Sequence, residues 1–131
     1  MASKIQAINA SRPRIKLGRT AGNEELIEFI ARSTGLNESG VRQALLELRD
    51  AVISFNKQGR AVKLDGLGTY TPSINLEGTI KVSHRADRTL KNALNMKSAF
   101  RGDILNRENI GKTGDDLVAM WNTANPGDLV S

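Results

Sequence analysis

The sequence has 131 residues, with 19 lysines and arginines against 14 aspartates and glutamates, which suggests one basic domain with short extensions. The absence of cysteine excludes disulfides and thiol nucleophiles, and the single histidine, His84, excludes histidine-cluster metal sites. No apolar run approaches the roughly 18 residues of a membrane helix, and Met1–Lys4 leads into no signal peptide. We therefore expect a cytoplasmic protein with no enzymatic activity, cofactor, metal ion, small-molecule substrate or membrane partner.

Residues 1–22 are predicted to form a basic N-terminal extension, because residues 1–19 contain no acidic side chain. Ile5 and Ile8 alternate weakly with polar residues, and Ile15 and Leu17 lie among cations, so an edge strand and a flexible arm are both compatible with the pattern. The cations of this segment are Lys4, Arg12, Arg14, Lys16 and Arg19.

Two helices are predicted next, over Asn23–Thr34 and Glu38–Gln58. Apolar residues of the first segment recur at helical spacing, Asn23 suits an N-cap, and Gly35 suits a left-handed C-terminal residue. Asn37 suits the N-cap of the second helix, which would be about 30 Å long.

The second helix carries an apolar stripe too wide for one intramolecular partner. Ala44, Leu46, Ala51 and Ile53 extend the stripe beyond its central residues. We therefore predict that a second chain covers it. The predicted dimer-interface residues are Val41, Leu45, Leu48, Val52 and Phe55.

The pattern then changes to short strands. Strands are predicted over 61–64, 69–76 and 79–85, with turns at Asp65–Gly68 and Glu77–Gly78. Pro72 interrupts the second strand, and because proline has no N–H to donate, it must lie at an edge or a bulge.

The rest of the chain is predicted to contain short helices. Arg88–Leu94 fits one or two helical turns, and Thr113 with Asp116 forms a capping pattern for a final helix. Gly111-Lys112-Thr113 is similar to the end of a phosphate-binding loop, but position 106 is Asn106 and no strand is predicted before it, so we favour a helix cap. Trp121 is interpreted as packing, with base stacking as the alternative.

Taken together, the corner Thr34-Gly35-Leu36, the apolar spacing of the hairpin and the turn Gly66-Leu67-Gly68-Thr69-Tyr70 resemble the HU and IHF family of bacterial histone-like proteins. The resemblance covers residues 23–94 and implies an α+β fold: a helical hairpin packed on a small antiparallel sheet. It leaves residues 1–22 and 95–131 as extensions, the latter with an added helix packed on the same domain.

The resemblance also implies a homodimer that binds double-stranded DNA in the bacterial nucleoid. Family members extend long arms tipped by Asn-Pro, whereas this chain has only Asn75-Leu76-Glu77-Gly78, so bending of DNA by a proline wedge is not expected.

The function expected from these observations is non-enzymatic binding of duplex phosphates with little sequence specificity. RNA is an alternative ligand, and a dimeric scaffold that contacts proteins is an alternative function. The predicted DNA-binding residues are Arg12, Arg14, Lys16, Arg19, Lys63, Lys81, His84, Arg85, Arg88 and Lys91.

Overall fold

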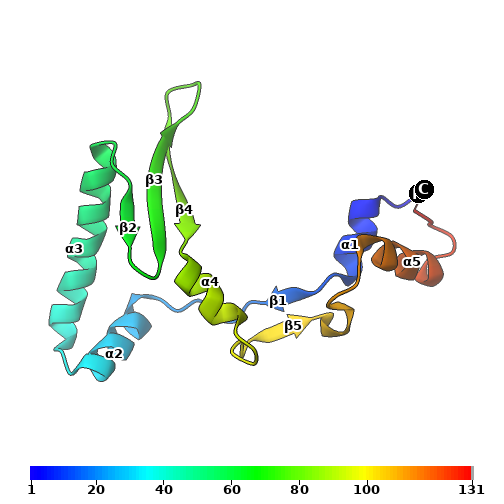
Figure 1. The fold of residues 1–131 in the computed structure, drawn as a ribbon, viewed down its shortest axis with the longest axis horizontal. Coiled ribbons are helices and arrows are strands. Elements are labelled where there is room, and N and C mark those ends of the chain that lie inside the picture. Colours follow the sequence, from blue (N-terminus) through cyan, green and yellow to red (C-terminus); the bar gives the residue numbers. More distant parts are fainter. Residues whose placement is uncertain (131) are drawn as a thin grey trace. The chain divides into compact units, whose positions relative to one another are not determined.

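The computed structural model describes residues 1–130 and divides into two compact units, each with its own contacts. One unit is Thr20–Phe100, and the other combines Met1–Arg19 with the residues from Arg101 onward (Figure 1). We call them the central unit and the terminal unit. The central unit contains helices and antiparallel strands, as the predicted α+β class requires. None of the helices in residues 1–130 is long and apolar enough to cross a membrane.

The central unit begins with a helical hairpin, α2 (Asn23–Thr34) and α3 (Glu38–Lys57). The left-handed residue Gly35 ends α2, and the Asn37 side chain caps α3 by accepting a hydrogen bond from the Ser39 amide (2.8 Å), as predicted. The predicted N-cap of α2 is displaced by one residue, since Gly22 holds that position and Asn23 is already helical. An exposed ion pair from Arg42 to Glu24 joins the two helices (2.7 Å).

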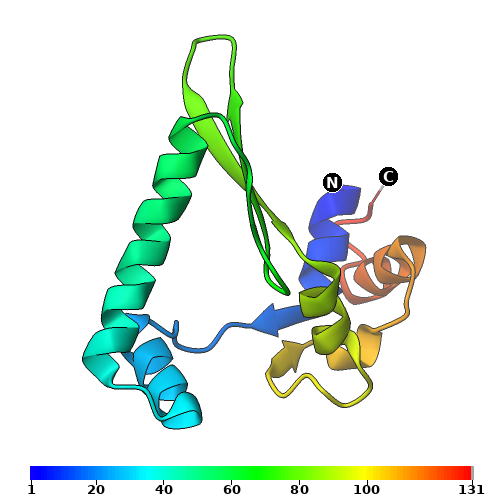
Figure 2. The same ribbon diagram turned by 60° about the vertical axis from the view of Figure 1, so that its left-hand side comes forward.

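A three-stranded antiparallel sheet in the order β2-β3-β4 follows the hairpin. The strands are β2 (Val62–Leu64), β3 (Gly68–Ile74) and β4 (Ile80–Ala86). β2 pairs with β3 only as far as Tyr70, so Pro72 has a partner strand on one side alone, which agrees with the predicted edge position. In both ribbon views the β3–β4 hairpin projects beyond the end of α3 (Figure 2).

The turn between β3 and β4 is held by one side chain. Asn75 Oδ1 accepts hydrogen bonds from the amides of Glu77 (2.9 Å) and Thr79 (3.0 Å). Helix α4 (Arg88–Asn95) follows β4 directly, and the amide of Asp87 donates to the carbonyl of Leu67 (2.9 Å). This bond attaches the start of α4 to the β2–β3 turn.

The central unit buries little apolar surface. Among the described residues of this unit, the buried apolar core consists of Ile27 and Val41. The stripe residues Leu48 and Phe55 remain 40% and 39% exposed. A unit of this size with so small a core has a large apolar surface left to cover.

The terminal unit pairs the two ends of the chain. Its elements are α1 (Lys4–Ser11), β1 (Arg14–Lys16), β5 (Asp103–Leu105), the 3-10 turn η1 (Arg107–Asn109) and α5 (Gly114–Ala124). Helix α1 packs on α5, and β1 pairs antiparallel with β5. Around Ile5 and Ile8 the expected edge strand or flexible arm is wrong, because Lys4–Ser11 is a helix that the Ser3 side chain caps. The short strand instead lies around Ile15.

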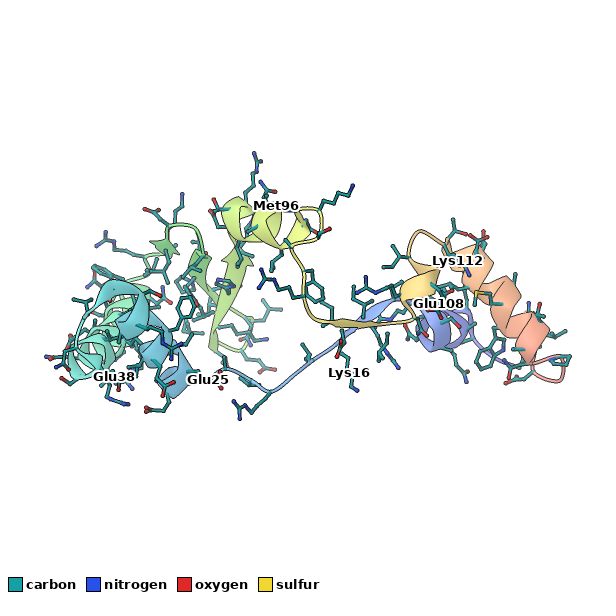
Figure 3. The ribbon with its side chains drawn as sticks, turned by 90° about the horizontal axis from the view of Figure 1, so that it is seen from below. Lys16, Glu25, Glu38, Met96, Glu108 and Lys112 are labelled. Atoms are coloured by element: carbon teal, nitrogen blue, oxygen red, sulfur yellow. The ribbon has the colours of Figure 1, made fainter. Side chains whose placement is uncertain are left out.

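Side-chain hydrogen bonds to the backbone hold the terminal unit together. The buried Asn109 donates to the carbonyl of Ser11 (2.6 Å) and accepts from Lys112 Nζ (2.9 Å). Figure 3 labels Lys112, which precedes α5. Thr113 and Asp116 form the predicted capping box at the start of α5. Trp121 donates from its indole to the Asp128 carbonyl (2.7 Å), in agreement with a packing role.

Most of the two predicted extensions, residues 1–19 and the residues from Arg101 onward, lie in one unit, whereas residues 20–22 and 95–100 belong to the central unit. The boundaries at residues 22 and 94, and the packing of residues 95–131 on the central domain, stay predictions.

Candidate nucleic-acid interface

The sheet of the central unit has apolar side chains on one face and cationic or polar side chains on the other. Alternate residues of a strand point to opposite faces, and the register places cross-strand partners on the same face. The pairs Tyr70–His84, Pro72–Val82 and Ile74–Ile80, together with Val62 and Leu64, form what we call the apolar face. The opposite face, which we call the cationic face, contains Lys63, Thr69, Thr71, Ser73, Lys81, Ser83 and Arg85.

The apolar face is the one turned toward α3. Leu64 and Tyr70 line an open groove of about 400 Å³ together with Leu48 and Val52 of α3. The cationic face therefore points away from the helix and is open to ligands. Lys63, Lys81 and Arg85 on this face are exposed.

A polar hollow of about 570 Å³ lies where the cationic face meets α4. Cations from three elements line it: Lys63 from β2, Arg85 from β4, and Arg88 with Lys91 from α4. Thr69 and Asn92 add hydrogen-bonding groups. None of these four cations forms an ion pair with the described residues 1–130.

One acidic residue, Asp87, also lines the hollow. Its carboxylate accepts a hydrogen bond from the Thr89 amide (3.0 Å) and so caps α4. The hydrogen bonds from Thr89 lower the pKa of Asp87, and the charges of Lys63 and Arg88 lower it further.

His84 lies on the other face of the sheet. Its ring contacts Tyr70, with centroids 4.7 Å apart and planes at 48°. It also covers Gly68, where an added Cβ would lie 2.5 Å from His84 Nε2. Of the residues predicted to bind DNA in this unit, His84 therefore does not reach the hollow, whereas Lys81 shares the cationic face farther along the hairpin.

The remaining predicted cations belong to the terminal unit. Arg14 and Lys16 lie on the exposed strand β1, and Lys16 is labelled in Figure 3. Arg12 follows α1 and accepts a hydrogen bond from Asn106 at its carbonyl (3.0 Å), and Arg19 follows β1. In the register of β1 and β5, Lys16 lies opposite Asp103, which offsets its charge.

Four residues that line the hollow were not predicted: Thr69, Ala86, Asp87 and Asn92. The sequence did contain a signal for two of them. Asp87 precedes a predicted helix at the position of an N-cap, and Thr69 alternates in register with the predicted Lys63. Asn92 has no comparable signal in the pattern.

The site has the chemistry of an anion receptor. Clustered exposed cations and neutral donors bind phosphate groups, whereas a metal would need clustered acidic or histidine ligands. No such cluster of three or more ligands occurs within residues 1–130. No aromatic side chain lines the hollow.

Comparison with known proteins agrees with the sequence motifs. Residues 5–102 match the model of a family described as HU-HIG, an HU domain fused to wHTH, Ig, or a glycine-rich motif. A protein from Vibrio proteolyticus called DNA-binding protein HU-alpha is 37% identical over 68 residues, which is 52% of this chain and 64% of that protein. The chain thus spans less than two thirds of the length of this relative.

The family match covers most of the chain and includes all of the central unit. The resemblance to HU proteins inferred from the helical corner and the glycine turn is confirmed, as is the α+β fold that it implied. The chain belongs to the HU-HIG family.

Proposed function

We propose that the protein binds double-stranded DNA as a non-enzymatic homodimer of the bacterial nucleoid, through contacts between its cationic face and backbone phosphates. The observation that carries this proposal is the hollow that gathers Lys63, Arg85, Arg88 and Lys91 from separate elements. The relative from Vibrio proteolyticus, described as DNA-binding, supports the same ligand.

The chemistry of the hollow favours low sequence specificity. Lysine and arginine contacts with phosphates position a protein on a duplex without identifying bases. Proteins that bind single strands usually stack bases on aromatic rings, and here Tyr70 lies on the face turned toward α3. A duplex is therefore favoured over single-stranded RNA. In this proposal Lys81 and the terminal-unit cations Arg12, Arg14, Lys16 and Arg19 add further phosphate contacts.

The apolar surface of α3 supports the homodimer. An isolated subunit would expose Leu48, Phe55 and their neighbours to water, and a self-complementary apolar surface is suited to a symmetric dimer. Val41 of α3 is already buried within the subunit. The proposed interface therefore depends on the other predicted residues, Leu45, Leu48, Val52 and Phe55.

The proposal is tested by fluorescence anisotropy with a random-sequence duplex over a range of salt concentrations. The four cations of one hollow, each neutralising one phosphate, contribute about −3.6 to the slope of log K against log salt, and a second hollow of the dimer on the same duplex contributes as much again. The double reversal R85E/R88E should weaken binding at least about fiftyfold at about 0.1 M salt and reduce the slope by about 2 for each hollow that contacts the duplex.

The control is R42E/R49E, which reverses the same number of charges on α3. Arg42 and Arg49 form exposed ion pairs with Glu24 and Asp50, and such pairs contribute little to stability. Circular dichroism verifies that both variants are folded. Equal losses of affinity in the two variants would show that the cationic face is not the DNA-binding site. Absence of wild-type binding at low salt would favour the dimeric scaffold instead.

A further inference from the structure

The cationic hollow contains a negative charge at a fixed position. Asp87 is the acidic residue among those that line it, and it lies between β4 and α4. A carboxylate in a phosphate-binding site opposes the ligand, so its presence needs a physical account.

The carboxylate of Asp87 cannot easily turn away from the hollow. It accepts the hydrogen bond from the Thr89 amide that caps α4 (3.0 Å). The main chain of the same residue is bonded on both sides, because its amide donates to Leu67 (2.9 Å) and its carbonyl accepts from Lys91 (3.1 Å). Side chain and backbone together hold the negative charge beside the four cations.

Asp87 also accepts from one of the amides that attract anions at the start of a helix. The first amides of a helix attract anions, but here the Thr89 amide is already bonded to the carboxylate. The hydrogen bonds from Thr89 and the charges of Lys63 and Arg88 lower the pKa of Asp87, so the carboxylate is ionised at neutral pH.

We propose that Asp87 lowers the affinity of the hollow for the duplex, because its fixed carboxylate repels the phosphates that the neighbouring cations hold. The inference rests on the proposed function of the same site. The cations of the hollow then hold phosphate groups against the repulsion of Asp87, and binding is weaker than the four cations would give without it.

The size of the effect follows from electrostatics. A carboxylate about 7 Å from a phosphate, at an effective dielectric constant of about 60, weakens binding roughly fourfold. If Asp87 instead cancels the neutralisation of one phosphate, the binding constant falls roughly eightfold at about 0.1 M salt. Both arguments predict a gain of about fourfold to eightfold when the charge is removed, and the gain should shrink as salt rises.

The test compares wild type with D87N and D87S in anisotropy titrations against the same random-sequence duplex. Asparagine and serine cap helices about as well as aspartate, so both variants keep the cap and lose the charge. The matched control is E28Q, which removes one negative charge from α2 outside the hollow. Circular dichroism melts establish that each variant is folded.

Tighter binding by D87N and D87S, with E28Q within about twofold of wild type, supports the inference. Unchanged or weaker binding by the folded Asp87 variants overturns it, and so does an equal gain in E28Q, since net charge would then explain the effect. The proposed function fails separately: it is overturned if R85E/R88E binds as tightly as wild type, whatever the Asp87 variants do.

Discussion

Gly68 is the position where a single methyl group should do the most damage to the sheet. Its φ of +156° is one that L side chains rarely adopt. A Cβ built there would collide with the carbonyl oxygen of Arg85 and lie 2.5 Å from His84 Nε2. The carbonyl belongs to the paired strand β4 and cannot move without shifting the hollow.

The cost of Gly68→Ala follows from these two conflicts. A strained backbone conformation costs on the order of 1 to 3 kcal/mol, and forcing extra volume into a packed site typically costs about 1 to 3 kcal/mol. We expect the free energy of unfolding to fall by about 3 to 5 kcal/mol.

Gly66→Ala is the matched control. Gly66 also has a positive φ of +79°, but a Cβ added there would meet nothing within 4 Å, so only the backbone strain of about 1 to 2 kcal/mol applies. The assay is urea unfolding followed by circular dichroism at one fixed protein concentration, because the stability of a dimer depends on concentration. If both variants lost the same stability, the close contact with β4 would not be the reason for glycine at position 68.

Three further outcomes are expected. Asn109→Ala should lower the stability of the terminal unit by about 1 to 3 kcal/mol, seen as faster hydrogen exchange in α1, because the Ser11 carbonyl loses its donor; unchanged exchange would contradict this. Leu48→Lys should give a monomer in sedimentation at micromolar concentration, whereas a dimer would move the interface away from α3. Glu24 has a pKa lowered from 4.5 by Arg42, so its stabilising effect is present above that value and is lost as pH falls through the lowered pKa. E24Q should remove this loss from urea midpoints measured from about pH 5 downward; identical acid profiles would refute it.

The elements predicted well from the sequence are those with local signals. Gly35, Asn37 and the pair Thr113–Asp116 mark helix ends through their own hydrogen bonds or backbone angles, and the structure has helix ends at these residues. Lys63 and Arg85 were predicted as DNA-binding cations, and the strand register places both on the cationic face, although they are far apart in the chain.

What the sequence did not predict depends on contacts between distant residues. The two isoleucines of α1 are too few to distinguish a helix from a strand by their spacing. The helix packs on α5, which lies near the other end of the sequence. The position of His84 was predicted from its neighbour Arg85, but adjacent residues of a strand point to opposite faces. Asp87 lines the hollow because α4 begins at its edge. The sequence signal for a helix cap does not show that the cap lies beside the cations.

The turn at Asn75 fixes the register of two strands. Its side chain fixes how β3 meets β4, and a shift of one residue in that pairing would exchange the inner and outer side chains of β4. Lysine and arginine would then face α3, and isoleucine and valine would face the solvent. The side-chain amide of Asn75 thus helps to set which face of the sheet is electrically positive.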